Sequence, residues 1–551
     1  MPPMVDVPRS PKATTAGWDA LARGAWEEAR ARFEAAAGSG DVADLEGLSW
    51  AAWWLEETDT CIVAREGAYR AYRAAGDDRS AGRMALWLAD DHADLRGEPA
   101  VAEGWFSRAA RLVADLEPCP EQGWLAAFEA HAALGRGDLD TALRRAGDAA
   151  ASGRRHGRVD LEMFAVATEG AVRLGKGEFD GGMRRLSEAA TAALAGEFEN
   201  LVPASWSCCL LIDACEDLRD HDRSAQWCEE IAAFSERTNA RFLRGVCRAH
   251  YGAILAWRGR LDDAERVLLA ATDSLTERRP TWRPEALARL GELRRLQGRH
   301  AEAAELFDAA PGHPLAQRGL AALSLDRDDP AGARDLLVRM LRRLPPGQRA
   351  RRSAALELLV RAELALGDHA AAVAHADELR TIAEDVGTEP LRAAADLAAG
   401  RVAAVSGAYA HACHRFEDAI DVLRRCGAPL EAAVVRVELA ATQRAMGRSD
   451  SAIREARSAV EALDGLLPRE RARAEAVLGQ RDDEGLHPHP LTPRQVEVLR
   501  LIAEGLSDQE IAERLVLSEH TVHRHVANIY TRLGCSSRAA AVAQASRRNL
   551  I

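Results

Sequence analysis

Residues 491–551 have the sequence LTPRQVEVLRLIAEGLSDQEIAERLVLSEHTVHRHVANIYTRLGCSSRAAAVAQASRRNLI, which carries the clearest helix signals of the chain. Thr492 and Ser507 are each followed three residues later by glutamine or glutamate. This is the spacing of a capping box, in which two side chains bond to free backbone amides. Ser518 is suited to cap a third helix. Glycines that can end the first and third helices follow them: Gly505 and Gly534. The stretch therefore predicts a domain of four short helices.

The third of these helices has an apolar face and a polar face. Apolar side chains recur along it with helical spacing: Val522, Val526, Ile529 and Leu533. At about 100° per residue, the opposite face carries His520, Arg524, Ala527 and Thr531, flanked by His523 and Asn528. The short turn Val516-Leu517 joins this helix to the preceding one, whose Ile511 and Leu515 face inward. A helix-turn-helix has this arrangement: a helix, a tight turn, and a second helix whose basic outer face enters the major groove.

The same residues resemble the LuxR-type helix-turn-helix, the C-terminal DNA-binding domain of many bacterial transcription regulators. The matching segments are LTPRQ, EVL, AEG, EIA, LSEHTV, NIY, RLG and SRA, and the resemblance covers all of 491–551, about one ninth of the chain. It implies a homodimer formed through the last helix, Arg538–Arg547, because two half-sites need two recognition helices. Gln495 replaces the family's usual glutamate but keeps the capping box. His523 and Arg524 stand where family members vary, so no operator sequence can be transferred.

The polar face of the third helix supplies the predicted DNA contacts. Base contacts are predicted for Arg524, His523, His520 and Asn528. Arg524 is the strongest of these, because a guanidinium can pair with O6 and N7 of guanine. Contacts with the phosphate backbone, which position the domain, are predicted for Thr521, Gln509, Arg532 and Arg538. His525 lies beside the apolar stripe, and we interpret it as a structural residue.

The charge of the chain is unevenly distributed. The net charge is -13, yet residues 491–551 contain 8 arginines and 6 acidic residues, which leaves -15 for the rest. Phosphates attract the C-terminal part and repel the acidic remainder. Double-stranded DNA is therefore expected as a partner of 491–551 alone.

Other features of composition indicate a cytoplasmic protein. No run of 18 apolar residues occurs, and residues 1–16 lack the apolar core of a signal peptide, so we expect no membrane partner and a disordered lead-in over 1–16. Ten cysteines without paired spacing fit reduced, buried side chains. The segment HACH contains His411 and His414, but neighbouring residues on one helix rarely converge on one ion. No metal site is predicted.

A second pattern fills the chain from Gly17 to about Leu466. A glycine is followed by alanine after five residues, by an apolar side chain after nine and by alanine again after twelve. Clear copies start at Gly24, Gly97, Gly137, Gly259, Gly298, Gly407 and Gly447, and weaker ones near Asp59, Gly177, Asp220, Asp328 and Gly367. The glycine ends one helix, and the small and apolar residues form one face of the next. The pattern resembles the tetratricopeptide repeat, in which stacked hairpins bury faces that none could bury alone.

The chain is thus predicted to be all-α, with a tetratricopeptide-like α-solenoid over 17–466 and a LuxR-type domain over 491–551. Strand signals are almost absent, because apolar and polar residues nowhere alternate over a sustained stretch. We expect the solenoid to form a right-handed superhelix with a concave groove. Residues 467–490 contain a short charged helix and then a stretch rich in Asp, Gly, His and Pro, which predicts a linker.

The solenoid also contains all twelve tryptophans, between Trp18 and Trp282. Three of them share one predicted helix: Trp50, Trp53 and Trp54. One interpretation is a groove that binds an apolar effector or a peptide through these side chains. The other, commoner for tryptophan in stacked hairpins, is that they fill gaps in the core.

Motifs of catalysis and of nucleotide binding are missing. The chain has no G-x-x-x-x-G-K-[ST] loop, no G-x-S-x-G elbow and no H-E-x-x-H pair, so neither enzyme activity nor a cofactor is predicted. We interpret the chain as a transcription regulator whose solenoid senses an effector or a partner protein and which also contacts RNA polymerase. The alternative is a repeat-protein adaptor whose C-terminal domain serves mainly in assembly. DNA binding by the C-terminal domain alone would separate the two.

Overall fold

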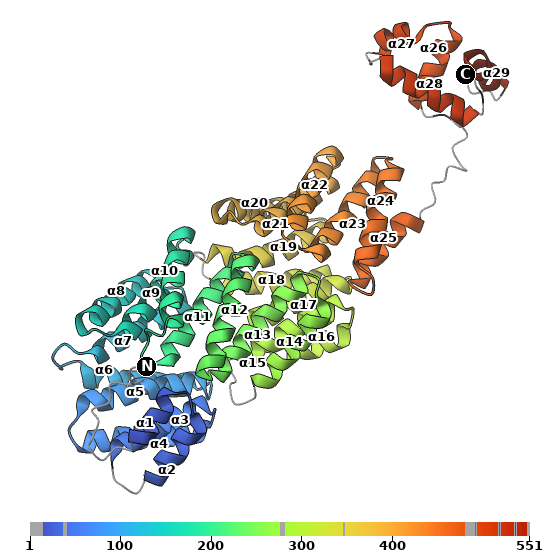
Figure 1. The fold of residues 1–551 in the computed structure, drawn as a ribbon. Helices are drawn as coiled ribbons and strands as arrows, with labels where there is room; N and C mark the ends of the chain where they lie inside the picture. Colours follow the sequence, from blue (N-terminus) through green and yellow to red (C-terminus); the bar gives the residue numbers. More distant parts are fainter. Residues whose placement is uncertain are drawn as a thin grey trace. The chain divides into compact units, whose positions relative to one another are not determined.

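The computed structural model describes residues 15–36, 41–275, 282–344, 348–479, 491, 493–515, 517, 519–533, 535 and 537–547. These residues form 29 α-helices and no β-strand, as the all-α prediction requires (Figure 1). The chain divides between Val477 and Leu478 into two compact units. None of the described helices is long and apolar enough to cross a lipid bilayer. Most of the predicted lead-in lies outside the described residues, and the first helix begins at Thr15.

The described part of the first unit is a stack of twelve helical hairpins. Their first helices are α1 (Thr15–Ala22), α3 (Val42–Trp54), α5 (Asp78–Asp94), α7 (Pro120–Arg136), α9 (Val159–Gly175), α11 (Leu201–Asp217), α13 (Arg241–Trp257), α15 (Arg283–Leu296), α17 (Pro314–Asp326), α19 (Arg349–Leu366), α21 (Glu389–Val405) and α23 (Pro429–Ala445). Their second helices are α2 (Trp26–Ala36), α4 (Thr58–Ala74), α6 (Pro99–Val113), α8 (Leu139–His156), α10 (Phe179–Leu194), α12 (His221–Thr238), α14 (Leu261–Ser274), α16 (His300–Asp308), α18 (Pro330–Arg343), α20 (His369–Val386), α22 (Tyr409–Arg425) and α24 (Ser449–Ala462). Hairpins that follow one another in the chain pack side by side, as in a tetratricopeptide-like solenoid (Figure 1).

A residue in the left-handed conformation joins the two helices of every hairpin. Nine of the twelve are the glycines of the repeat pattern, with φ between 66° and 84°. The other three are Glu56, Arg219 and Asp328, with φ of 60°, 52° and 59°. These three turns belong to weak copies of the pattern, in which no glycine is available. A left-handed turn costs a residue with a Cβ about 1–2 kcal/mol, so the packing of the hairpins must offset that cost.

The alanine and apolar positions of the pattern form the core between hairpins. In the copy that starts at Gly259, Ala264, Leu268 and Ala271 are fully buried. The corresponding side chains are also buried in the copies that start at Gly137, Gly298, Gly407 and Gly447. In the copy that starts at Gly97, Ala102 and Phe106 are half-buried or less, and their helix α6 has few contacts with the following hairpin. The pattern therefore locates the core correctly in most of the repeats.

Phenylalanines on some second helices fit against glycines of neighbouring first helices. A Cβ added at Gly400 would lie 2.4 Å from the ring of Phe416, and one added at Gly47 would lie 2.3 Å from the ring of Phe33. Two glycines enclose the ring of Phe307 in the same way. These rings fill the space that the missing side chains leave, so the glycines serve packing and not a turn.

Contacts also join hairpins that lie far apart in the sequence. Nε1 of Trp26 donates a hydrogen bond of 2.9 Å to the carbonyl oxygen of Asn239. Arg351 forms a 2.6 Å ion pair with Asp217. Each of these contacts links a hairpin to one four or five hairpins further along the chain. The first unit is therefore wound tightly enough for its hairpins to meet again.

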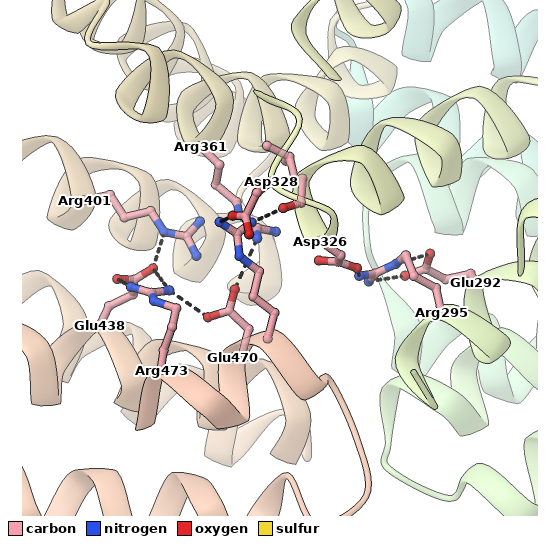
Figure 2. A network of polar contacts seen from close by, with 11 residues as sticks. Glu292, Arg295, Asp326, Asp328, Arg361, Arg401, Glu438, Glu470 and Arg473 are labelled. Carbon is pink, nitrogen blue, oxygen red and sulfur yellow. Dashed lines mark hydrogen bonds and ion pairs between the residues drawn. The ribbon is translucent and has the colours of Figure 1, made fainter. Parts of the chain in front are cut away.

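Helix α25 (Pro468–Gly479) lies in the segment predicted as a linker, yet it packs on the first unit. The Leu467 amide donates to the Leu296 carbonyl oxygen over 2.8 Å. Buried Glu470 accepts hydrogen bonds from Arg361 at 3.2 Å and from Arg473 at 2.7 Å (Figure 2). Glu438 and Arg401 extend this network through Arg473. Arg469 of the same helix forms a separate ion pair with Asp328. The short charged helix predicted in this segment is therefore α25, whereas residues 480–490, which include the predicted linker 485–490, lie outside the described residues.

The second unit contains α26 (Pro493–Ala503), α27 (Asp508–Leu515), α28 (Glu519–Leu533) and α29 (Arg538–Arg547), the four predicted helices. It has a hydrophobic core of its own, formed by side chains of all four helices. The Ser507 amide donates to Glu510 Oε2 (2.7 Å) and the Glu510 amide to Ser507 Oγ (3.3 Å), which is the predicted capping box. Gly505, with φ of 91°, ends α26 as predicted. Positions 492, 518 and 534, where further caps were predicted, lie outside the described residues.

Candidate nucleic-acid interface

Helix α28 turns its apolar stripe into the core of the second unit. Val522 and Ile529 are fully buried, and Val526 and Leu533 are at most 5% exposed. Because an α-helix has 3.6 residues per turn, positions 520, 524, 527 and 531 lie on the face that points away from this core. Ile511 of α27 is also buried, and only the connection 516–518 separates α27 from α28. The two helices form the expected helix-turn-helix pair.

Two of the four side chains predicted to contact bases are described, and both are exposed. The side chain of His523 is 77% exposed, with Nδ1 3.4 Å from Oδ2 of Asp508, and Asn528 is exposed as well. His520 and Arg524 belong to α28, but their side chains lie outside the described part, as do those of Thr521 and Arg532. The base contacts stay predictions.

Arg538, predicted to contact a phosphate, is bonded within the domain. Its Nη1 donates to Asp508 Oδ1 over 2.7 Å, and its Nη2 donates to the Leu506 carbonyl oxygen over 2.6 Å. These bonds tie the start of α29 to the start of α27. This role could not be predicted from local spacing, because Arg538 and Asp508 are 30 residues apart.

The other predicted residues of this surface are less constrained. Gln509 is exposed on the first turn of α27, and its Nε2 lies 3.4 Å from Glu513 Oε1 of the same helix. His525 is half-buried beside the apolar stripe, where we expected a structural residue. Hydrogen bonds from the amide and hydroxyl of Ser507 lower the pKa of Glu510. The Glu510 carboxylate is therefore ionised at the N-terminus of α27, where the helix dipole favours a negative charge.

Residues 489–545 match the family described as bacterial regulatory proteins, luxR family. This segment is a LuxR-family domain. A putative HTH-type transcriptional regulator of Mycobacterium bovis is 47% identical over 58 residues, which cover 10% of this chain and 7% of that protein. The Fimbriae Z protein of Salmonella typhimurium is 51% identical over 53 residues, 10% of this chain and 25% of that protein. The transcriptional regulatory protein LiaR of Bacillus subtilis is 42% identical over 69 residues, 12% of this chain and 33% of LiaR.

The matches to these relatives cover 10–12% of this chain and span 7–33% of the length of the three proteins. By this domain, the chain carries the helix-turn-helix of a family of transcription regulators. Among solved structures, a Rap protein complexed with Competence and Sporulation Factor is similar with a TM-score of 0.46 and 11% identity. The similarity covers 63% of this chain and 98% of the Rap chain.

Away from the LuxR-family domain, the three tryptophans considered as effector contacts lie in the core. Trp50, Trp53 and Trp54 are at most 2% exposed. The ring of Trp54 stacks on that of Trp26, with centroids 4.9 Å apart and an interplanar angle of 11°. The ring of Trp53 meets that of Phe242 edge-on at 5.4 Å. Their placement matches the second interpretation, in which tryptophans fill gaps in the core, and not an apolar groove.

Trp54 nevertheless borders a cavity of about 410 Å³. Arg241, Arg244 and Arg248 line this cavity from α13. Their spacing of three and four residues places them on one face of the helix. Their helical spacing is visible in the sequence, but the cavity that they line is not, because it forms only when α3 and α13 pack together. Glu56 lines the cavity as well, so three guanidinium groups stand against one carboxylate, and this excess of positive charge suits an anionic ligand better than an apolar one.

Proposed function

We propose that the protein is a cytoplasmic transcription regulator that binds double-stranded DNA sequence-specifically through α28. The observation that carries the proposal is a LuxR-family helix-turn-helix whose core-facing stripe leaves position 524 outward. Arg524 pairs with a guanine, and His520, His523 and Asn528 contact neighbouring bases. Thr521, Gln509 and Arg532 contact phosphates, whereas Arg538 mainly holds α29 in place. No catalytic step is assigned to any residue.

The proposal includes a homodimer formed through α29. Ala541 and Ala545 of this helix are buried in the domain's own core. Ala539, Ala543 and Ser546 are exposed at spacings of four and three residues, so they lie on one outer face. Small side chains on that face allow two copies of α29 to approach closely.

The first unit is proposed to sense an effector and to control the DNA-binding domain, which in turn contacts RNA polymerase. The arginine-lined cavity beside Trp54 supports a small anionic effector. An effector changes DNA binding only if it binds one conformation of the protein better than the other. The adaptor alternative has less support, because two of the named relatives, those of Mycobacterium bovis and Bacillus subtilis, are described as transcriptional regulators.

Recovery of genomic DNA fragments by the intact protein tests the proposal. The intact chain, Arg524→Ala and the control Arg500→Ala are each incubated with sheared genomic DNA at one salt concentration. Arg500 is exposed on α26, so the control removes an equal charge from another helix. We expect a shared motif to be enriched by the intact chain and by Arg500→Ala but not by Arg524→Ala. Equal enrichment of the motif by the intact chain and by both variants would refute the role of Arg524.

A further inference from the structure

Three metal-ligating side chains from three successive first helices meet inside the first unit. Asp213 of α11, His250 of α13 and Glu285 of α15 each offer one ligand atom, and these atoms lie within 4.8 Å of one another. The His250 side chain is 2% exposed, that of Glu285 17% and that of Asp213 44%. The cluster is thus buried at the histidine and open at Asp213.

The two distances from His250 to the carboxylates are those of ligands around one ion. His250 Nε2 lies 2.9 Å from Glu285 Oε1 and 3.4 Å from Asp213 Oδ1. Two ligands at about 2.1 Å from a shared ion are about 3.0 Å apart at a right angle and about 3.4 Å apart at a tetrahedral angle. His250 Nε2 is buried, yet it forms no hydrogen bond among the described residues, although Glu285 Oε1 is close enough. Glu285 Oε1 thus lies close to Nε2 but away from the direction in which an Nε2–H bond would point. Two ligands of the same ion are placed relative to one another in this way.

The other ring nitrogen of His250 has the partner that metal-binding histidines usually have. Glu216 Oε2 lies 3.0 Å from His250 Nδ1. When the ring proton is on Nδ1, this carboxylate accepts it and Nε2 is free to bind a metal. When Nδ1 instead accepts a hydrogen bond from Arg289, the proton is on Nε2 and the ion must displace it. Arg289 forms ion pairs with Glu216 and with Glu285, the latter at 2.6 Å, and also lies 3.0 Å from His250 Nδ1. It thereby fixes the direction of both carboxylates.

The charges of this cluster leave room for a divalent cation. Asp213, Glu216 and Glu285 contribute three negative charges when ionised, and Arg289 contributes one positive charge. A divalent ion would bring the sum to zero while His250 stays neutral. One imidazole nitrogen and two carboxylate oxygens suit a transition-metal ion better than Ca²⁺ or Mg²⁺, which prefer oxygen ligands alone.

We infer that Asp213, His250 and Glu285 bind a divalent transition-metal ion. The sequence did not predict this site, because its ligands come from three repeats that only the stacking of the hairpins brings together. The ion ties three successive hairpins to one another. The inference does not depend on DNA binding. A proton on His250 Nε2 competes with the ion for the same nitrogen.

Metal titration of the intact chain tests the inference. The protein is stripped with a chelator and then titrated with Zn²⁺ by calorimetry, with Mn²⁺ by electron paramagnetic resonance, and with Mg²⁺. We expect one Zn²⁺ or one Mn²⁺ per chain, weak or no binding of Mg²⁺, and a melting temperature that rises with Zn²⁺. Mn²⁺ has little affinity for thiols, so its binding excludes the ten cysteines as the site.

Variants assign the bound ion to these residues. Asp213→Asn, His250→Gln and Glu285→Gln should each weaken binding at least about tenfold. Asp213→Asn is the most informative, because this half-exposed side chain can change without disturbing the core. His375→Gln is the matched control, since His375 faces a single carboxylate, Glu363, at 2.8 Å. The inference is wrong if the stripped protein binds no ion, or if Asp213→Asn and His375→Gln bind as tightly as the unchanged chain.

Discussion

At the scale of single residues, Arg538 links the position of α29 to that of the helix-turn-helix. Loss of its guanidinium removes a partner of Asp508 and of the Leu506 carbonyl oxygen, and because these groups are only half-buried the cost is about 0.5–1.5 kcal/mol. We predict that Arg538→Ala lowers the melting temperature of the fragment 485–551, which contains the whole core of the second unit. Thermal unfolding followed by circular dichroism measures the change.

Arg547→Ala is the control for this prediction, because within the described part of the chain Arg547 bonds to its own helix α29, at Gln544 and the Ala543 carbonyl oxygen. It should leave the melting temperature nearly unchanged. An Arg538→Ala fragment with unchanged melting temperature but weaker DNA binding would restore the original prediction of a phosphate contact.

The sequence predicted the framework of the candidate interface better than the bonds of its side chains. The stripe from Val522 to Leu533 follows from helical spacing alone, and its burial bears this out. The bonds of Arg538 depend on how α29 returns to α27, which no local pattern records. The same reason hides the arginines beside Trp54, whose cavity exists only once α3 and α13 are packed together.

At the scale of elements, glycines on the first helices determine how closely neighbouring hairpins pack. We predict that Gly400→Ala destabilises the chain by about 1–3 kcal/mol, because the added Cβ would lie 2.4 Å from the ring of Phe416. Gly147→Ala is the control, since nothing lies within 4 Å of the added Cβ in α8, and it should stabilise by about 0.5–1 kcal/mol. Urea unfolding of both variants measures the difference, and equal effects would show that Phe416 does not limit the packing.

A buried carboxyl on α23 gives the first unit a pH-dependent stability. Burial raises the pKa of Glu431 from 4.5 to about 7, and Glu357 and Glu292 add to the effect while Arg219 opposes it. Because the folded pKa is raised, the stability from this group is complete below pH 4.5 and is lost as the pH rises through 7. We predict that Glu431→Gln is more stable than the unchanged chain at pH 8, by up to about 3 kcal/mol, and differs little at pH 5.

Urea unfolding of the intact chain and of Glu431→Gln at the two pH values checks this prediction. Glu461→Gln, at an exposed position of α24, is the control and should change stability little at either pH. A gain from Glu431→Gln that is the same at pH 5 and pH 8 would contradict the assignment.

Helices and turns could be predicted because each repeat carries its own local signals. Three turns lack glycine, and the sequence predicts their positions only to within a few residues. Nothing in the local sequence marks Glu56, Arg219 and Asp328 as the residues that adopt the left-handed conformation. The packing of α25 could not be predicted, because its charges meet partners more than 100 residues away, such as Arg361. Contacts between hairpins four or five apart depend on the curvature of the whole stack.

At the scale of the whole molecule, the acidic charge outside the LuxR-family domain should weaken DNA binding. The intact chain has a net charge of -13, whereas residues 485–551 have a net charge of +2. We predict that the intact chain binds random-sequence DNA more weakly than the fragment 485–551 at low salt, and that the ratio of the two affinities approaches one as salt rises. Fluorescence anisotropy at several salt concentrations measures this ratio. A ratio that does not change with salt would mean that charge does not cause the difference.

Sequence-specific DNA binding by the C-terminal domain is the central claim, and selection from a pool of random DNA tests it most directly. The fragment 485–551 and its Arg524→Ala variant are carried through the same rounds of selection at one salt concentration. We predict that the fragment enriches one short, nearly palindromic motif and that the variant loses preference at a guanine within it. A pool that stays random with the unchanged fragment would contradict the claim and favour a role in assembly.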